Sequence, residues 1–242
     1  AMMMRRALVI FVLVAVAIPL MLAMAELPRH GSPDAPPQTH VAPYYLEHGP
    51  EEAGAENIVT AVILNYRGLD TQGEVTVIFT AMAAVVAVLV AGGAGVPADR
   101  AAAPATTPVS LIVRFIVRVL APFIVLFSVY VILNGHVTPG GGFQGGTILG
   151  ALLIALTLIM SESDARALLP QRPERLLQAA APLTFFAVGM IGLLLTGDYL
   201  AYPHSGPTIW IATLMLTVVE IGIGIGGAMV VATIFRTMGA DR

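Results

Sequence analysis

Four ionisable side chains stand out because each lies inside or beside a strongly apolar segment. Glu220 falls within the run TLMLTVVEIGIGIGGAMVV, Asp70 and Glu74 stand four residues apart before a second run, and His136 follows a third. A charge at the centre of a bilayer costs roughly 2.5 to 3.5 kcal/mol on insertion scales, so an ionisable group there by default faces the protein interior or a water path. These residue types favour the passage of protons or cations, and we take the four as candidate ion-pathway residues.

Each candidate also has a structural interpretation that the sequence leaves open. Glu220 could be a protonated carboxyl that hydrogen-bonds a neighbouring helix. Asp70 could cap the helix that follows it, while Glu74 offsets the positive end of that helix. A lone His such as His136 near an interface is often a hydrogen-bonded structural residue, although histidine, which ordinarily titrates near neutral pH, also suits a proton relay.

Two further polar residues follow the fifth apolar run. Asp198 and His204 fall in a loop that we expect on the same side of the membrane as Asp70, Glu74 and His136. Together these residues could form an outer mouth that leads inward to Glu220. Taken singly, each is the kind of residue that a solvated loop carries.

The elements that position these residues are transmembrane helices. The chain is 57% hydrophobic and 11% charged, with a mean hydropathy of +0.86, which is typical of a membrane protein. Six segments are long enough to cross a bilayer, the fourth with 143–146 as its first turn: 7–25, 75–94, 109–133, 147–160, 176–195 and 208–235. The first also resembles a secretory signal, ending in Ala23-Met24-Ala25, but we expect it to remain as a span. The predicted fold class is an all-α integral membrane protein.

The basic residues predict the orientation of these spans. The chain has no Lys, and ten of its twelve Arg fall at cytoplasmic ends if the N-terminus is inside. Six spans then place both termini in the cytoplasm, in a multi-pass protein of a prokaryotic inner (plasma) membrane. Residues 26–56, rich in Pro, Gly and acidic side chains, become an irregular outer loop.

Composition also divides the chain into two modules. Residues 1–95 form a predicted two-helix module, and residues 109–242 form a four-helix module. Residues 96–108, rich in Ala, Pro and Thr, read as a linker between them. Within the first module, residues 57–66 are apolar but too short to span, so we expect an interfacial or re-entrant segment followed by a polar turn, RGLDTQGE.

The glycines of the second module predict close helix packing. The segment NGHVTPGGGFQGGT, residues 134–147, matches the dinucleotide fingerprint G-x-G-x-x-G literally, but it follows an apolar run and not a strand of a βαβ unit. Its spacing instead gives two small-xxx-small steps, which let helix backbones approach closely, and a similar role is expected in the last span. The candidate packing glycines are Gly142, Gly146, Gly150, Gly222 and Gly226.

The absence of Cys from the sequence excludes disulfides, thiolate nucleophiles and iron–sulfur ligation by this chain. We also expect no catalytic residues, no cofactor, no metal centre and no nucleic-acid partner. Any redox centre must belong to another chain.

Two motifs carry a family resemblance. Residues 56–82, which include NIVTAVILNYRGLDTQGE, resemble the segment near the C-terminal end of the large subunit of Mrp-type multisubunit sodium/proton antiporters, and the small homologous subunit of membrane-bound hydrogenases. The segment GHVTPGGGFQGG resembles the signature of the antiporter's B-type subunit. Where many antiporter versions have Asp-Phe before Arg-Gly, this chain has Asn65-Tyr66, which is closer to the hydrogenase type.

The resemblance implies a noncatalytic membrane subunit of an Mrp-type cation/proton antiporter that helps to carry sodium ions or protons. One alternative is an antiporter-module subunit of a redox-driven ion pump such as a membrane-bound hydrogenase. Another is a purely structural membrane subunit. The implied partners are other membrane subunits, the lipid bilayer, sodium ions and protons.

Overall fold

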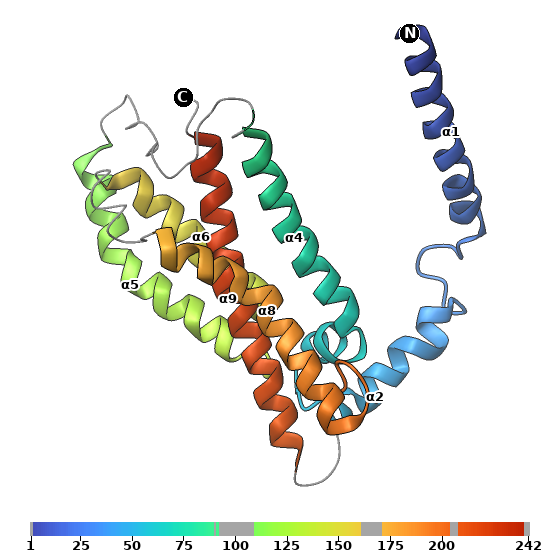
Figure 1. The fold of residues 1–242 in the computed structure, drawn as a ribbon. Coiled ribbons are helices and arrows are strands. Elements are labelled where there is room, and N and C mark those ends of the chain that lie inside the picture. The colour runs from blue at the N-terminus through green and yellow to red at the C-terminus, as the bar shows by residue number, and fades with distance from the viewer. Residues whose placement is uncertain (1, 90, 92–108, 161–170, 204–207, 240–242) are drawn as a thin grey trace. The chain divides into compact units, whose positions relative to one another are not determined.

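The computed structural model describes residues 2–89, 91, 109–160, 171–203 and 208–239. Every regular element in these ranges is a helix, which confirms the expected all-α class (Figure 1). The linker expected at residues 96–108 lies outside the described residues, so the division into modules at residue 95 stays a prediction. The chain forms two compact units, Ala1–Leu46 and Glu47–Arg242.

Six helices within the described residues are long and apolar enough to cross a membrane, as expected. The fourth of them begins at Gly142, so the glycine-rich residues do supply its first turn. The side of the membrane that each helix end faces stays a prediction. The six helices are α1 (Met2–Glu26), α4 (Gly68–Leu89), α5 (Leu111–Leu133), α6 (Gly142–Ile159), α8 (Gln171–Thr196) and α9 (Ile209–Gly239).

The first unit contains α1, the short π-helix η1 (Pro37–Val41) and the start of α2 (Ala42–Glu52). The expectation of an irregular loop over residues 26–56 is therefore wrong in part, because residues 37–52 are helical. In the apolar part of α1, the described part of the chain buries no residue. Apolar side chains cover this helix on all sides, which is the pattern of a helix that lipid or other helices surround.

The second unit opens with an irregular helical segment. Asn57 caps the one-turn helix α3 (Ile58–Thr60) by accepting a hydrogen bond from the Val59 N–H at 3.0 Å. The π-helix η2 (Ala61–Tyr66) follows directly, and it leaves a carbonyl at Ile63 that the Thr71 hydroxyl satisfies at 2.6 Å. This segment is too short to span a bilayer, as the sequence indicates.

The polar turn expected at RGLDTQGE is wrong in detail. Only Arg67 lies outside the helices, with φ −126° and ψ 34°, and α4 begins at Gly68. A single residue separates the π-helix from α4, so the polar residues form the first two turns of α4 instead of a loop.

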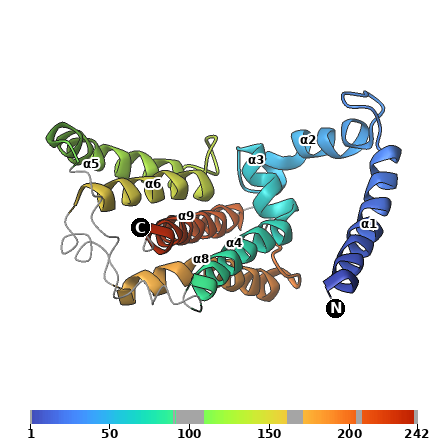
Figure 2. The same cartoon turned by 90° about the horizontal axis from the view of Figure 1, so that it is seen from above.

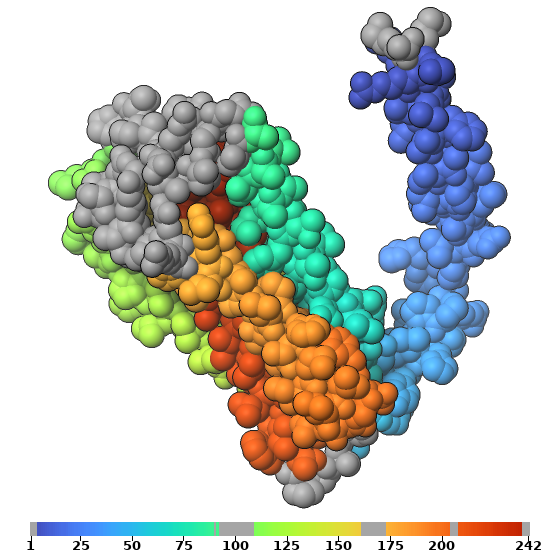
Figure 3. Space-filling model, viewed as in Figure 1, coloured from blue at the N-terminus to red at the C-terminus, as the bar shows by residue number. Residues whose placement is uncertain are grey.

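Helix α9 is the centre of the second unit. Figure 2 shows α5 and α6 on one side of α9, with α4 and α8 on the other, and α6 and α8 make its most extensive helix contacts. The apolar window of α9 is 61% buried, against 17% for α5 and 6% for α4. The space-filling view shows α4, α5 and α8 at the surface, with parts of α9 visible between α5 and α8 (Figure 3).

The candidate packing glycines lie where these helices meet. A Cβ on Gly146 of α6 would lie 2.7 Å from the Gly224 carbonyl oxygen of α9, and one on Gly150 would lie 3.3 Å from the Ala228 carbonyl oxygen. On the opposite face of α9, a Cβ on Gly222 or Gly226 would meet side chains of α8 at 2.8 and 2.7 Å. The glycines therefore serve contacts within this chain, and the small-residue faces permit backbone approach without lipid between.

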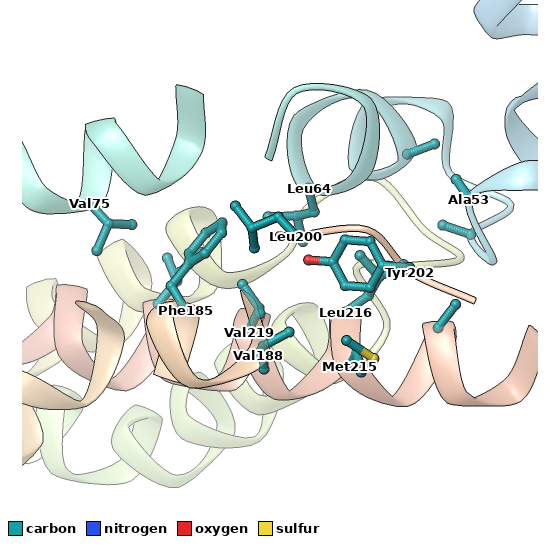
Figure 4. Close-up of a cluster of buried hydrophobic side chains, with 14 of the residues drawn as sticks. Ala53, Leu64, Val75, Phe185, Val188, Leu200, Tyr202, Met215, Leu216 and Val219 are labelled. Carbon is teal, nitrogen blue, oxygen red and sulfur yellow. The ribbon is translucent and has the colours of Figure 1, made fainter. Parts of the chain in front are cut away.

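An apolar cluster at one end of the unit joins segments that are distant in sequence (Figure 4). Leu64 of η2 and Val75 of α4 lie with Phe185 of α8 and Leu216 of α9. Tyr202, from the connection after α8, is 1% exposed in the same cluster. Residues on both sides of the predicted linker thus share one core.

The close contact of α6 with α9 should depend on the missing side chain at Gly146. We expect Gly146→Ala to destabilise the protein by about 1 to 3 kcal/mol, because the added methyl group meets backbone that has no freedom to move aside. Thermal unfolding in detergent or bicelles measures the change.

Gly227→Ala is the matched control, since an added Cβ there has no neighbour within 4 Å among the described residues. Alanine favours a helix over glycine by up to about 1 kcal/mol, so this variant should be as stable as the wild type or slightly more so. An equal loss of stability in both variants would show that α6 and α9 do not depend on close packing at Gly146.

Candidate functional site

Glu220 lies deep in the helical bundle. It is the twelfth of the 31 residues of α9, and it is 2% exposed. Its Oε1 accepts a long hydrogen bond of 3.4 Å from the Thr60 hydroxyl. Its Oε2 is buried and has no hydrogen-bond partner within the described chain. A buried carboxyl group with one free oxygen is costly to maintain, which makes it the first candidate for a functional group.

Backbone atoms of the hairpin between α5 and α6, residues 134–141, enclose this carboxyl group. A Cβ on Gly135 would overlap the carboxylate, and one on Gly141 would lie 3.0 Å from Oε1. Gly141 also has φ +117°, a conformation that other residues rarely adopt. One residue later, a Cβ on Gly142 would lie 2.5 Å from the backbone oxygen of Glu220. The glycines are there because the hairpin backbone itself forms the wall of the Glu220 pocket.

Asn57 and Thr60 hold the hairpin in this position. The Asn57 side-chain amide donates to the carbonyls of Gly135 and Thr138 at 2.8 and 2.9 Å, and the Asn57 backbone N–H donates to the His136 carbonyl at 3.0 Å. The Thr60 hydroxyl donates to the Gly135 carbonyl at 2.6 Å. Segments from both sides of the predicted linker therefore build the pocket together.

His136 lies in the same hairpin, next to Gly135. Its ring is half-buried, and its Nδ1 is a buried atom without a hydrogen-bond partner in the described part of the chain. The structural interpretation of His136 as a hydrogen-bonded residue therefore leaves its Nδ1 unexplained, because that atom has no partner in the described part of the chain. His136 and Glu220 are two proton-binding groups that one hairpin brings into the same region.

Asp70 and Glu74 lie on one exposed face of α4, as their spacing of four residues requires. Asp70 pairs with Arg67 at 2.5 Å, in an ion pair whose side chains are 54% and 62% exposed. The buried face of α4 instead carries Thr71 and Val75. The structure does not bring these two carboxylates into the Glu220 pocket, because the residues beside them face the core.

The expected outer mouth is described only in part. Asp198 is exposed in the bend after α8, and His204 lies outside the described residues. The neighbouring Tyr199 hydroxyl accepts a hydrogen bond of 2.7 Å from the Gln72 amide of α4, which ties this connection to the start of α4. Burial, with a smaller contribution from Tyr199, raises the pKa of Tyr202, so that its hydroxyl stays protonated.

A second polar cluster, which sequence reasoning missed, joins α8 to α9. The Arg236 guanidinium forms an ion pair with the buried Glu174, and the Thr233 hydroxyl donates to the same carboxylate at 2.7 Å. The Gln178 amide donates to Thr233 at 2.6 Å. One oxygen of Glu174 accepts from all of these partners, so the cluster fixes the two helices to each other.

Asn57 and Thr60 were also missed as site residues. A helix-capping signal at Asn57 is visible in the sequence, but nothing there indicates a partner 78 residues away at Gly135. Within the described residues, no group of three or more His, Cys, Asp or Glu could hold a metal ion.

Thr60→Val should loosen the hairpin, since it leaves the Gly135 carbonyl and Glu220 short of a donor at nearly unchanged side-chain volume. We expect the free energy of unfolding to fall by about 1 to 3 kcal/mol. Hydrogen exchange in residues 134–141, measured by mass spectrometry, should become faster. Thr76→Val is the matched control, because the Thr76 hydroxyl bonds only the Gln72 carbonyl of its own helix at 2.8 Å. Unchanged exchange in the Thr60 variant would mean that this hydrogen bond does not hold the hairpin.

Comparisons with known proteins support the resemblance that the segments 56–82 and GHVTPGGGFQGG indicate. Residues 112–235 match the model of a domain related to the MnhB subunit of Na+/H+ antiporters, and residues 4–93 match the model of MbhE, the E-type subunit of MBH. The chain is 31% identical to the B-type subunit of the Na(+)/H(+) antiporter of Bacillus subtilis over 138 residues, which are 54% of this chain and 94% of that protein. It is 29% identical, over 60% of its length, to an uncharacterized protein of Methanocaldococcus jannaschii, of which it spans 59%.

Two solved structures resemble the whole chain. One is a chain of the membrane-bound sulfane sulfur reductase, an archaeal respiratory membrane complex, with 32% identity and a TM-score of 0.70 over 97% of this chain and 98% of that one. The other belongs to the Mrp complex from Dietzia sp. DQ12-45-1b, with 26% identity and a TM-score of 0.69 over 97% of this chain and 26% of that chain. Since the MnhB-related match covers more than half of the 242 residues, the chain belongs to the family of domains related to the MnhB subunit of Na+/H+ antiporters.

Proposed function

We propose that the chain is a noncatalytic, multi-pass membrane subunit of a cation/proton antiporter module in a prokaryotic plasma membrane, and that Glu220 lies on its ion route. The family match and the six membrane-capable helices support the membership in such a module. The observation that carries the role of Glu220 is its buried Oε2, which has no hydrogen-bond partner in the described chain.

A purely structural role explains this carboxyl group poorly. A leucine or methionine would fill a similar volume without the cost of burying a polar group, which is several kcal/mol when an ionised carboxylate is left unpaired. The other buried carboxylate of the described bundle, Glu174, has three side-chain partners, Arg236, Thr233 and Gln178, one of which is a cation. Within the described residues, Glu220 has only the long bond from Thr60.

The module needs further subunits. Among the described residues, the ionisable candidates Asp70 and Glu74 lie on a face of α4 that this chain does not cover. A charged face within a membrane-spanning assembly calls for a neighbouring protein surface or a water-filled cavity. We propose that Asp70, Glu74 and Asp198 serve the route from such a neighbour, with His136 between that surface and Glu220.

One observation favours a second setting for the same module, a redox-driven complex. The whole chain corresponds to one whole chain of the archaeal sulfane sulfur reductase, with 97% and 98% coverage, whereas it corresponds to 26% of the chain in the Dietzia Mrp complex. The chain has no Cys, so iron–sulfur clusters would belong to its partners.

Glu220→Gln should abolish ion transport by the assembled complex. The amide keeps the size of the side chain but cannot take up or release a proton, so we expect at least a tenfold drop in ion flux, on the order of 1.4 kcal/mol or more in the barrier. Flux is measured with a pH-sensitive dye in vesicles that contain the purified complex.

Glu51→Gln provides the control, because Glu51 is an exposed carboxylate of the same unit. Both variants should assemble with the wild-type set of subunits. Normal flux in a fully assembled Glu220→Gln complex would remove Glu220 from the ion route.

The composition of the native complex decides between the two settings. We expect purification in a mild detergent, followed by mass spectrometry, to recover antiporter-type membrane subunits with this chain. Iron–sulfur subunits in stoichiometric amount would place the module in a redox-driven complex. Their absence from an intact, active complex would favour a secondary antiporter.

A further inference from the structure

We propose that the Glu220 pocket accepts a proton and excludes a dehydrated sodium ion. The proposal rests on the function proposed above, in which Glu220 lies on the ion route, and it names the ion for that step. Three features of the pocket support it: the oxygens around the carboxyl group, the space beside it and the charges that face it.

The oxygens near Glu220 are already engaged. A sodium ion that leaves water needs several oxygen ligands to replace its hydration shell. The Gly135 carbonyl, next to the carboxylate, accepts from both the Asn57 amide at 2.8 Å and the Thr60 hydroxyl at 2.6 Å, which uses its two lone pairs. The Thr138 carbonyl accepts from the same Asn57 amide at 2.9 Å. Building a sodium shell here would require breaking the bonds that hold the hairpin.

The space beside the carboxylate is also small. The backbones of Gly135 and Gly141 approach it so closely that even one methyl group on either residue would crowd it. From the helix side, Gly142 packs against the backbone of Glu220. A proton adds no volume to the carboxyl group, whereas a sodium ion with its ligands needs room on more than one side.

Few charged groups face the pocket from the helices that pack around it. Between residues 209 and 235 of α9 no other residue is ionisable, and none is ionisable in α6. Asp70 and Glu74 lie on the exposed face of α4, and the residue that α8 places against Gly222, two residues after Glu220, is Thr184, which is not ionisable. The ionisable residues of α5 are all exposed: Arg114, Arg118 and Tyr130.

The short segments place one titratable residue beside the glycines of the pocket wall. Asn57 and Thr60 are the polar side chains before η2 that bond the hairpin, and in η2 the Tyr66 hydroxyl is bonded to Glu52 at 2.7 Å. The hairpin contributes His136. One titratable residue, His136, therefore adjoins Gly135 of the pocket wall, and the described helices around the pocket supply no ring of charged ligands.

The proton step is simple. Oε2 forms an O–H bond with an arriving proton and the carboxylate becomes neutral, which removes the cost of a buried charge. Release breaks the same bond and returns the negative charge to the carboxylate. We assign the exchange of the proton with Glu220 to His136, which follows Gly135 in the hairpin and whose buried Nδ1 has no hydrogen-bond partner in the described part of the chain.

Difference infrared spectroscopy of the purified native complex tests the proposal, because the C=O stretch of a protonated carboxyl group is separate from that of a carboxylate. We expect a band that is present in the wild type, absent in Glu220→Gln and retained in Glu51→Gln. Its amplitude should change with pH, and its midpoint pH should be the same in sodium and in potassium buffers.

Sodium binding would give a different result. An ion that binds the ionised carboxylate lowers the midpoint by about one pH unit for each tenfold rise in sodium concentration above its dissociation constant. Such a shift overturns the proposal, and so does a Glu220 that stays ionised at every pH at which the complex is intact.

Thr60→Val provides a second variant if Glu220→Gln fails to assemble. It removes the hydrogen bond from Thr60 to Glu220 while leaving the carboxyl group in place, so the Glu220 band should shift in frequency and still respond to pH and not to sodium. The flux assay is independent of this readout. A sodium-insensitive band in a complex whose Glu220→Gln variant transports normally would refute the ion route but not the proton site.

Discussion

The second unit is arranged around the contact between the glycine-rich hairpin and α9. The backbones of Gly135 and Gly141 pack against the Glu220 carboxyl group, while Asn57 and Thr60 hydrogen-bond the hairpin. A Cβ on Gly135 would meet the Glu220 carboxylate, and a Cβ on Gly142 or Gly146 would meet the backbone of α9. Helix packing and the chemistry of the pocket therefore have the same physical requirement, which is close approach of the backbones of the hairpin and α6 to α9.

Packing of this kind suits a membrane. Lipid tails are as apolar as leucine, so helices inside a bilayer associate through van der Waals contact and hydrogen bonds and not through the hydrophobic effect. Helix α9 makes both van der Waals contacts and polar contacts with its neighbours. Small residues bring it against α6 and α8, and the Glu174–Arg236 pair fixes the end of α8 to the end of α9. This leaves Glu220 as a buried carboxyl group of α9 that the chain does not fully satisfy.

The composite pocket also gives a reason for having both segments in one chain. Residues 4–93 and 112–235 match two different family models, and the pocket draws Asn57 and Thr60 from the first and Gly135, Gly141 and Glu220 from the second. Neither segment alone would complete the wall around the carboxyl group. Joining them fixes their ratio at one to one, which the geometry of this pocket requires.

Local patterns of residues were enough to predict the helical class, the six apolar spans, the short segment before the second span and the unusual acid of the last one, because hydropathy and residue spacing are local properties. The same spacing selected the packing glycines. The folded chain was needed to show that Asn57 and Thr60 face Gly135, that Asp70 and Glu74 point away from Glu220, and that Glu174 pairs with Arg236. Those outcomes depend on which faces of distant helices meet, and no local pattern in the sequence encodes such a meeting.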